Sequence, residues 1–348
     1  MKSKKYKPSR KLRVIMLADD KLLPVGELKD FSEKQRELRK TEFDVKVALE
    51  ELGHEVVAIG VSDDLSTIRG AIDALKPHIA FNLVEEFDGI GRFDQHVVSY
   101  LELRKQPYTG CNPRGLTLAR DKALTKKILA YQGIKVPEFA IFPKRRALKR
   151  PERLAFPLFV KSLTEEGSAG LSSASIVNDD EKLAERVEFI HRTTKSTAIA
   201  EQYIEGREIY VGVMGNDRTA TLPAWEFSST KDSGKPLIAT DRAKWDPEYQ
   251  RQHGLKTGPA KLSEKSRQQL ASLSKEIYRA LGISGYARLD YRLTEAGDAY
   301  LLEANPNPQI AKDEDFAKSA MHIDISYPEL IDQLLRLGMR YVPSRIIG

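Results

Sequence analysis

Three side chains in the last third of the sequence have the types and the spacing to share one metal ion. Asp290 lies in one β-prone run, and Glu303 and Asn305 lie in the next. The segment Thr294 to Asp298 between these runs is typical of a hairpin turn, which predicts two adjacent antiparallel strands. Glu303 and Asn305 are two residues apart, so they point to one face of their strand. Such oxygen donors suit Mg²⁺ or Mn²⁺ that is also held by substrate phosphates. The alternative is a surface hairpin whose acids are merely solvated.

The composition is that of an ordinary globular protein. The chain has 348 residues with 41% hydrophobic content, enough for two or three subdomains with their own cores. Its 56 basic and 50 acidic residues give a net charge of +6, with basic clusters at Lys2 to Arg13 and at Lys144 to Arg150. Such clusters can contact nucleic acid or an acidic partner. We expect a solvated tail and a basic linker instead, and no nucleic-acid partner.

The cysteine count and the hydropathy pattern bear on the compartment. Cys111 is the single cysteine, so no internal disulfide is possible and a reducing compartment is expected. The basic N-terminus is not followed by a signal-like apolar core, because the short run Val14 to Ala18 leads straight into two aspartates. No apolar stretch reaches the length of a membrane span. We expect a cytoplasmic protein with no membrane partner.

Hydrophobic periodicity predicts an α/β architecture that begins with a parallel βαβαβ unit. Ser32 and Gln35 have the spacing of a capping box at the start of its first helix. The predicted strands of this unit are Leu12–Leu17, Val56–Val61 and Ile79–Leu83, and its helices are Ser32–Leu52 and Asp64–Leu75. The later predicted helices are Gln95–Leu103, Asp121–Gln132, Ser263–Leu281 and Tyr327–Leu337. The later predicted strands, besides the hairpin, are Ala140–Phe142, Leu158–Lys161, Ser172–Ile176, Thr197–Ile204, Glu208–Met214 and Thr219–Trp225.

Six short motifs occur in an order that resembles the ATP-grasp carboxylate-amine ligases, and among them the D-alanine-D-alanine ligases. They are Pro107-Tyr-Thr-Gly110, Asp121-Lys-Ala-Leu-Thr-Lys126, Pro157-Leu-Phe-Val-Lys161, Glu201-Gln-Tyr-Ile-Glu-Gly-Arg-Glu208, Gly285-Tyr-Ala-Arg-Leu-Asp290 and Leu302-Glu-Ala-Asn-Pro-Asn-Pro308. The resemblance implies an ATP-grasp fold with an N-terminal parallel domain over residues 1–118. Two ATP-clamping subdomains would follow over residues 119–206 and 207–348. It also implies ATP with two Mg²⁺ or Mn²⁺ ions, and ligation through an acyl phosphate that an amine attacks.

The resemblance assigns most of the nucleotide contacts. Lysines would face the phosphates, since several negative oxygens lie close together there. Glu201 would accept a hydrogen bond from the adenine amino group, and Glu208 would hold the ribose hydroxyls; the alternative for both is an edge-strand acid facing water. The small-residue loop Thr164 to Gly170 would close over the phosphates, although an ordinary turn has the same composition. The implied ATP-binding residues are Lys122, Lys161, Ser168, Glu201, Gln202, Ile204, Glu208 and Lys244.

Arg288 is the predicted catalytic residue. It lies two positions before Asp290, hence on the same strand face. In the family this arginine stabilises the oxyanion that forms when the amine attacks, and fixed positive charge at such a place is often the largest catalytic contribution. The alternative is an arginine that only pairs with a metal-site carboxylate.

The sequence also departs from the D-alanine-D-alanine ligases. The family's glycine-rich first turn, with its acid that grips the first D-alanine, is replaced by Leu17 to Gly26. The phosphate loop has Gly167 where the family has a serine, and Trp245 stands in place of that serine's tyrosine partner. The serine that binds the acceptor's carboxylate gives way to the acidic run Lys312 to Asp315, which would favour an amine-rich acceptor or be a solvated loop.

These departures predict a ligase that acts on small-molecule carboxylate and amine substrates other than two D-alanines. The alternatives are a D-alanine-D-alanine ligase proper, a non-catalytic ATP sensor, or a ligase that modifies a protein or an RNA-bound acceptor. A homodimer is also compatible with this fold. The predicted substrate contacts are Glu85, Glu86, Asp313, Glu314 and Asp315, the first two because ligands of α/β proteins lie beyond the carboxyl ends of parallel strands.

Overall fold

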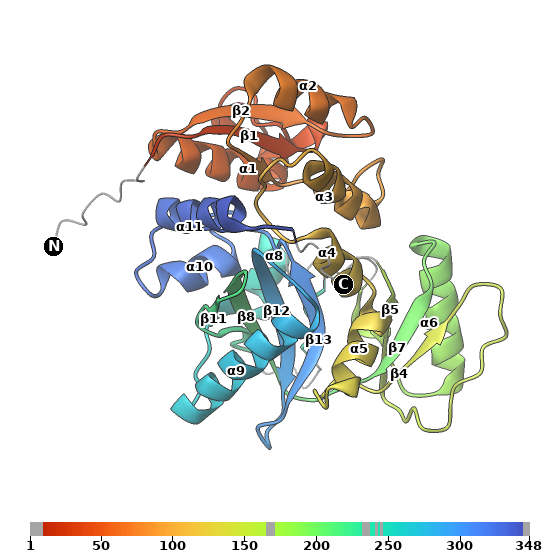
Figure 1. The fold of residues 1–348 in the computed structure, drawn as a ribbon. Coiled ribbons are helices and arrows are strands. Elements are labelled where there is room, and N and C mark those ends of the chain that lie inside the picture. The colour runs from red at the N-terminus through yellow and green to blue at the C-terminus, as the bar shows by residue number, and fades with distance from the viewer. Residues whose placement is uncertain (1–9, 165–170, 232–236, 241–242, 244–245, 344–348) are drawn as a thin grey trace.

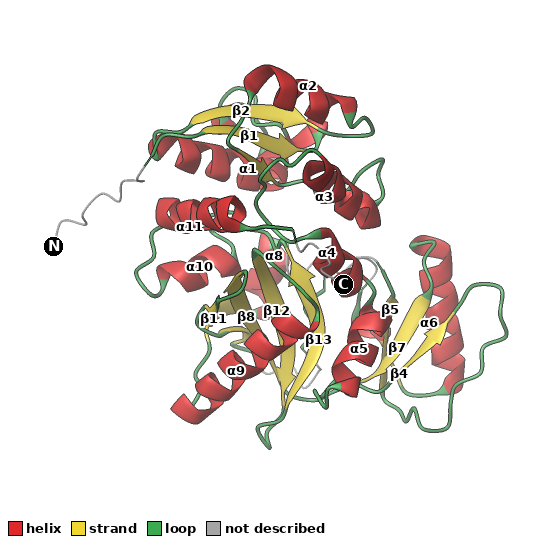
Figure 2. Cartoon of the chain, viewed as in Figure 1, coloured by secondary structure: helices red, strands yellow, loops and turns green. Residues whose placement is uncertain are grey.

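The computed structural model describes residues 10–164, 171–231, 237–240, 243 and 246–343. Three β-sheets follow one another along the chain, each with helices against it (Figure 1). Helices and strands alternate in the N-terminal part, whereas antiparallel strands dominate from β4 onward (Figure 2). The α/β prediction is therefore confirmed. Within the described residues, no helix is both long and apolar enough to cross a membrane.

The first sheet confirms the predicted parallel unit. Its strands are β1 (Arg13–Ala18), β2 (Glu55–Gly60) and β3 (Ile79–Asn82), in the order β2-β1-β3 with both pairings parallel. The helices between them are α1 (Glu33–Glu51) and α2 (Ser66–Leu75). Ser32 caps α1, and Ser32 and Gln35 form the reciprocal hydrogen bonds of a capping box. This local hydrogen bonding explains why the start of α1 was predictable.

Three helices connect the first sheet to the second: α3 (Asp94–Leu103), α4 (Pro113–Arg120) and α5 (Lys122–Tyr131). The sequence predicted α3 and α5 but not α4. Asp121 separates α4 from α5, because its backbone is extended and its carboxylate accepts hydrogen bonds from the N–H groups of Ala123 and Leu124. This N-cap fixes the first turn of α5 and places Lys122 at its start.

The second sheet contains β4 (Phe139–Phe142), β5 (Leu158–Ser162), β6 (Ile176–Val177) and β7 (Ala198–Gln202), all antiparallel in the order β4-β7-β5-β6. The predicted strand Ser172–Ile176 is wrong, since Ser173–Ser175 form a 3₁₀ turn and β6 starts only at Ile176. Serine side chains bond to the backbone in this turn and compete with a strand. Helix α6 (Asp180–Thr193), which the sequence did not predict, packs its apolar side against the sheet.

The third sheet carries the predicted hairpin. Its strands are β8 (Arg207–Gly215), β9 (Thr219–Thr221), β10 (Trp225–Ser229), β11 (Leu255–Pro259), β12 (Tyr286–Leu293) and β13 (Ala299–Pro306). The order is β11-β10-β8-β12-β13, with β9 also paired to β8. The predicted strand Thr219–Trp225 is in fact two strands, because β9 and β10 each pair separately with β8. Helices α8 (Pro247–His253) and α9 (Glu264–Ala280) belong to this region.

The last two helices return to the first sheet. They are α10 (Asp315–Met321) and α11 (Tyr327–Arg340), which lie between the first and third sheets in Figure 1. Leu330 and Leu334 of α11 share a buried core with Val14 of β1 and Leu49 of α1. The first and third sheets are therefore joined by packing between segments far apart in the sequence.

Candidate active site

One face of the β12–β13 hairpin brings the predicted metal and catalytic side chains together. The two strands are antiparallel, as predicted, and the register pairs Arg288 with Asn305 and Asp290 with Glu303. Directly paired residues point to the same face of a sheet. The opposite face is apolar, since Leu289 and Tyr291 are fully buried in the core. The alternation along β12 thus separates a charged face from a hydrophobic one.

A β-bulge in β13 determines which face Glu303 occupies. The register shifts between Asp290, which pairs with Glu303, and Tyr291, which pairs with Leu301, so Leu302 has no partner in β12. Leu301 is 1% exposed and lies in the core. In a regular strand Glu303 would share that face with Leu301, because they are two residues apart. The extra residue turns Glu303 away from the core and toward Asp290.

Arg288 is held against Asp290 by two hydrogen bonds. Its Nε lies 2.8 Å from Asp290 Oδ1, and its Nη2 lies 2.9 Å from Oδ2. The guanidinium also lies over the ring of Tyr210, 4.7 Å from the ring centroid. Burial lowers the pKa of Arg288, but the Asp290 carboxylate outweighs it, so the pKa is raised. The arginine is a fixed, permanently charged group on this face.

The remaining two metal candidates lie next to this pair. Asn305 Nδ2 donates a hydrogen bond of 3.0 Å to Asp290 Oδ2. The Lys122 ammonium, from the first turn of α5, lies 3.0 Å from Glu303 Oε1. The structure therefore brings Asp290, Glu303 and Asn305 into one cluster with Lys122 and Arg288. Each carboxylate of the cluster has a cation beside it.

Glu201 of β7 is the centre of a second charged cluster, which is buried. Lys126 Nζ lies 3.1 Å from Glu201 Oε1, and Lys161 Nζ lies 3.3 Å from Oε2. Burial raises the pKa of Glu201, but the two ammonium groups outweigh it and the pKa lies below its usual value. Lys161 and Glu201 lie on one face of the sheet, because both strands alternate in register across the β5–β7 pairing.

Two lysines share this carboxylate but titrate differently. Burial lowers the pKa of Lys126 to about 8, and the attraction of Glu201 offsets this only in part. Burial also acts on Lys161, but Glu201 and Glu303 outweigh it, and its pKa is raised. Lys161 is therefore the more firmly charged of the two.

Glu208, the predicted ribose ligand, lies on β8 in a different surrounding. The Tyr210 hydroxyl donates a 2.8 Å hydrogen bond to its Oε1, and Arg292 Nη2 lies 2.9 Å from its Oε2. The last residue of β7 and the segment after it hold the other predicted adenine contacts. Gln202 is exposed and its N–H bonds to the carbonyl of Glu138, whereas Ile204 is 7% exposed.

The predicted substrate residues are divided between two places. Glu85 and Glu86 follow β3, where Glu85 is exposed and its carbonyl accepts a 3.1 Å hydrogen bond from Arg120. Asp313 and Glu314 are tied to α1 by Lys40, whose Nζ lies 3.4 Å and 2.5 Å from their respective carboxylates.

Asp315, the third member of the acidic run, is the first residue of α10. It acts electrostatically on Arg288. The acidic run therefore joins α1 to the charged hairpin face, and Lys40 offsets the charge of its first two acids. Ser168 and Lys244, the other predicted ATP contacts, lie outside the described residues, as does Trp245.

Lys126, Tyr210 and Arg292 belong to the site but were not among its predicted residues. Lys126 had a signal in the sequence, because it lies four residues after Lys122 and hence on the same helix face. Tyr210 and Arg292 had the corresponding strand signal, two residues from Glu208 and from Asp290. Side chains of these types are common on exposed faces, and only the tertiary structure shows their partners.

The donor atoms fit ATP and a divalent cation. Glu201 Oε1 is buried and has no hydrogen-bond partner among the described residues, despite its ion-pair contact with Lys126. An adenine amino group is a donor that would satisfy this acceptor. No group of three His, Cys, Asp or Glu side chains in the described parts of the chain is arranged to hold a metal alone. Two carboxylates with one carboxamide match a Mg²⁺ ion that takes further oxygens from phosphate and water.

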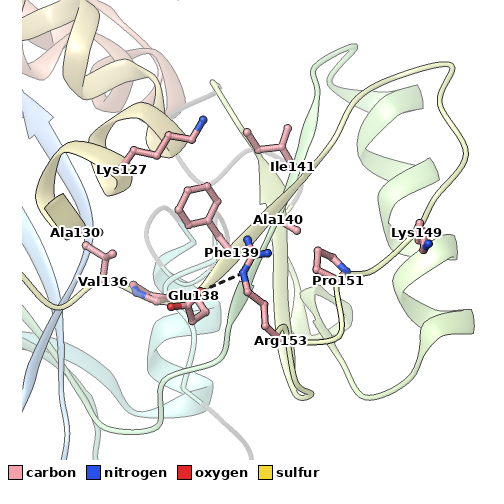
Figure 3. A pocket seen from close by; sticks show the side chains of 11 residues that line it. Lys127, Ala130, Val136, Glu138, Phe139, Ala140, Ile141, Lys149, Pro151 and Arg153 are labelled. Atoms are coloured by element: carbon pink, nitrogen blue, oxygen red, sulfur yellow. Dashed lines mark ion pairs between the residues drawn. The ribbon is translucent and has the colours of Figure 1, made fainter.

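Beside the Glu201 cluster lies a pocket of about 540 Å³ between α5 and β4 (Figure 3). Lys127, Phe139 and Ile141 line it, together with the segment from Lys149 to Arg153. Arg153 lies 3.7 Å from Glu138 across the pocket. Phe139 pairs with Glu201 in the β4–β7 register, so this pocket adjoins the strand that carries the predicted adenine contact.

Comparisons with known proteins bear on the family of this chain. The family model described as D-ala D-ala ligase C-terminus matches residues 128–336. An uncharacterized protein, y4sG of Sinorhizobium fredii, is 33% identical over 311 residues, which cover 87% of this chain and 89% of that protein. A D-alanine--D-alanine ligase of Desulforudis audaxviator is 30% identical over 302 residues, with 84% and 91% coverage.

Solved structures show the same fold. A D-alanine--D-alanine ligase from Bacillus anthracis, complexed with ATP, superposes with a TM-score of 0.74 at 23% identity, over 94% of this chain and 98% of that one. The VanG D-Ala:D-Ser ligase from Enterococcus faecalis gives a TM-score of 0.67 at 18% identity, over 94% and 99%.

Proposed function

Because the chain belongs to the D-alanine-D-alanine ligase family of ATP-grasp enzymes, we propose that it joins a carboxylate to an amine and that the two substrates are not both D-alanine. In the first step the substrate carboxylate attacks the γ-phosphorus of ATP and displaces ADP. In the second step the amine nitrogen attacks the acyl phosphate, phosphate leaves, and the nitrogen loses a proton. Residues 119–206 and 207–348 would form the two subdomains that hold ATP.

The charged face of the hairpin is the observation that carries this proposal. Asp290, Glu303 and Asn305 would hold one or two Mg²⁺ or Mn²⁺ ions, which would neutralise phosphate charge. Lys122 and Lys161 would face the phosphates, and Lys244 is proposed for the same role from its sequence. Arg288 lies beside the metal donors, where it would stabilise the oxyanion of the second step.

Glu201 would bind the adenine amino group through Oε1, beside the backbone of Gln202 and Ile204. Glu208 would bind the ribose hydroxyls. Glu85, Glu86 and Asp315 are the proposed substrate contacts. Asp313 and Glu314 are weaker candidates for an amine substrate, because Lys40 already offsets their charge.

A panel of substrate pairs tests the proposal. Phosphate release from ATP and Mg²⁺ would be measured with pairs of amino acids and amines, using Asp290→Ala and Glu303→Ala as controls. We expect release that needs one particular pair and that is lost in both variants. If no pair gives release although ATP binds, the ligase proposal fails for free small-molecule acceptors.

A D-alanine-D-alanine ligase proper is the second candidate, because curated relatives carry that name. The replaced first turn and the acidic run after β13 argue against it. D-alanine alone, with ATP and Mg²⁺, decides between the two. Formation of D-alanyl-D-alanine at about 1 to 10³ s⁻¹, the usual range for enzymes, would overturn our preference.

A further inference from the structure

Two consecutive lysines of α5 lie in opposite surroundings. Lys126 is 1% exposed, whereas Lys127 is exposed and extends along the wall of the pocket in Figure 3. Lys126 lies one helical turn after Lys122, so both point toward the charged clusters. Lys126 is thus separated from solvent although its neighbour on the same helix is not.

Lys126 connects the two antiparallel sheets through its ammonium group. Its Nζ donates a 2.7 Å hydrogen bond to the carbonyl of Leu302 on β13, in the third sheet. The same atom lies 3.1 Å from Glu201 on β7, in the second sheet. Leu302 is the extra residue of the bulge that turns Glu303 toward Asp290. One buried cation therefore contacts both the predicted adenine ligand and the bulge next to a predicted metal ligand.

Stability alone does not explain a lysine at this position. Removing an ammonium group from water is costly, and apolar side chains of similar volume are often as stabilising as a buried ion pair. A methionine here would fill the space between the sheets without that cost. An apolar side chain cannot supply the hydrogen bond to Leu302 and the ion pair with Glu201.

We propose that Lys126 is a positioning residue that fixes the adenine end and the metal end of the site relative to each other. It orients the Glu201 carboxylate, and it holds the Leu302 carbonyl so that the bulge keeps Glu303 beside Asp290. This inference rests on the proposed function. When a residue that contacts and orients a metal ligand is replaced, metal affinity or activity typically falls by about 10- to 100-fold.

The test compares Lys126→Met with Lys126→Arg, and uses Lys127→Met as the matched control on the same helix. The full-length proteins would be titrated with ATP at several Mg²⁺ concentrations by calorimetry, without any carboxylate or amine. We expect Lys126→Met to raise both the Kd for ATP and the half-saturating Mg²⁺ concentration about 10- to 100-fold. Lys126→Arg, which keeps the charge and the donors, should recover most of this loss. Lys127→Met should bind within about twofold of the wild type, because Lys127 contacts neither cluster.

Thermal unfolding of the same proteins separates positioning from packing. If Lys126→Met lowers the Tm but leaves ATP and Mg²⁺ binding within about threefold of the wild type, the proposal is overturned. If Lys126→Met does not fold, Lys126→Gln replaces it with the same expected loss. These binding measurements need no turnover, so they test the role of Lys126 separately from the ligase proposal. A wild type that binds ATP and Mg²⁺ but never releases phosphate would refute the ligase proposal. The role of Lys126 would still be decided by the binding of its variants.

Discussion

The acids of the hairpin face and of the adjacent Glu201 cluster have cation partners, whereas Glu42, beside the first sheet, has an oxygen with no hydrogen-bond partner among the described residues. On the hairpin face and in the adjacent Glu201 cluster, Asp290, Glu303, Glu201 and Glu208 each have an arginine or a lysine within about ion-pair distance, at 2.8, 3.0, 3.1 and 2.9 Å. Beside the first sheet, Glu42 of α1 is 4% exposed, and its Oε2 has no hydrogen-bond partner among the described residues.

The pKa values of Glu201 and Glu42 differ in the same sense as their contacts with cations. The paired Glu201 has a pKa below its usual value although it is buried. Burial raises the pKa of Glu42 from 4.5 to about 7, the negative charges of Glu85 and Asp19 add to the rise, and Arg39 and a backbone hydrogen bond oppose it. Glu201 is therefore held in its charged form, whereas burial favours the protonated form of Glu42. Among the described residues, Arg39 lowers the pKa of Glu42 but does not outweigh burial.

The largest effect is expected at Arg288. Arg288→Met should lower kcat by about 10²- to 10³-fold, because a positioned cation at the oxyanion is lost. Phosphate release with the best substrate pair, measured at increasing Mg²⁺ concentration, checks this. If excess Mg²⁺ restores the rate, Arg288 serves only to neutralise Asp290, and the catalytic assignment is wrong.

A smaller effect on stability is expected at Glu42. The pKa of Glu42 is higher in the folded protein than in the unfolded chain. The free energy of unfolding therefore contains the full contribution of the protonated form below about pH 4.5, and this contribution is lost as the pH rises through 7. Glu42→Gln should remove this loss and be more stable than the wild type at pH 8 by about 3.5 kcal/mol, at about 1.4 kcal/mol for each pKa unit. The two proteins should be equally stable near pH 4.5.

Urea unfolding of both proteins at pH 4.5, 6 and 8 measures this difference. If the free energies of unfolding of the wild type and of Glu42→Gln change with pH in the same way, Glu42 is paired with a cation in solution. Glu42 would then not differ from the paired acids of the hairpin face.

The smallest effect is expected at Lys40, where a surface ion-pair cluster joins the two regions. Lys40→Met should reduce the free energy of unfolding by about 1 kcal/mol, since Asp313 and Glu314 lose their partner at a partly exposed site. Lys34→Met, at an exposed position of the same helix, is the control and should be neutral. A loss that persists in 1 M NaCl would show that packing of the lysine stem, rather than its charge, supports the acidic run.

Much of the fold could be predicted because its signals are local. The capping box at Ser32, the alternation along β12 and the turn before β13 are set by residues a few positions apart. The strand predicted at Ser172 failed because serine side chains form a turn with their own backbone. Helix α4 was missed although Asn112 and Pro113 form a local helix-start signal, an N-cap followed by proline in the first turn.

By itself, the sequence determined the identities and the face of Arg288 and Asp290, the pairing of the hairpin, and the family. Only the tertiary structure decided that the bulge at Leu302 separates Glu303 from the core and that Lys126 lies between two sheets. It also decided that Glu42 is buried with an oxygen that has no hydrogen-bond partner among the described residues. The physical reason is the separation along the chain over which each effect acts. Strand alternation and capping act over two to four residues, whereas burial and charge pairing depend on segments that meet only in the folded chain.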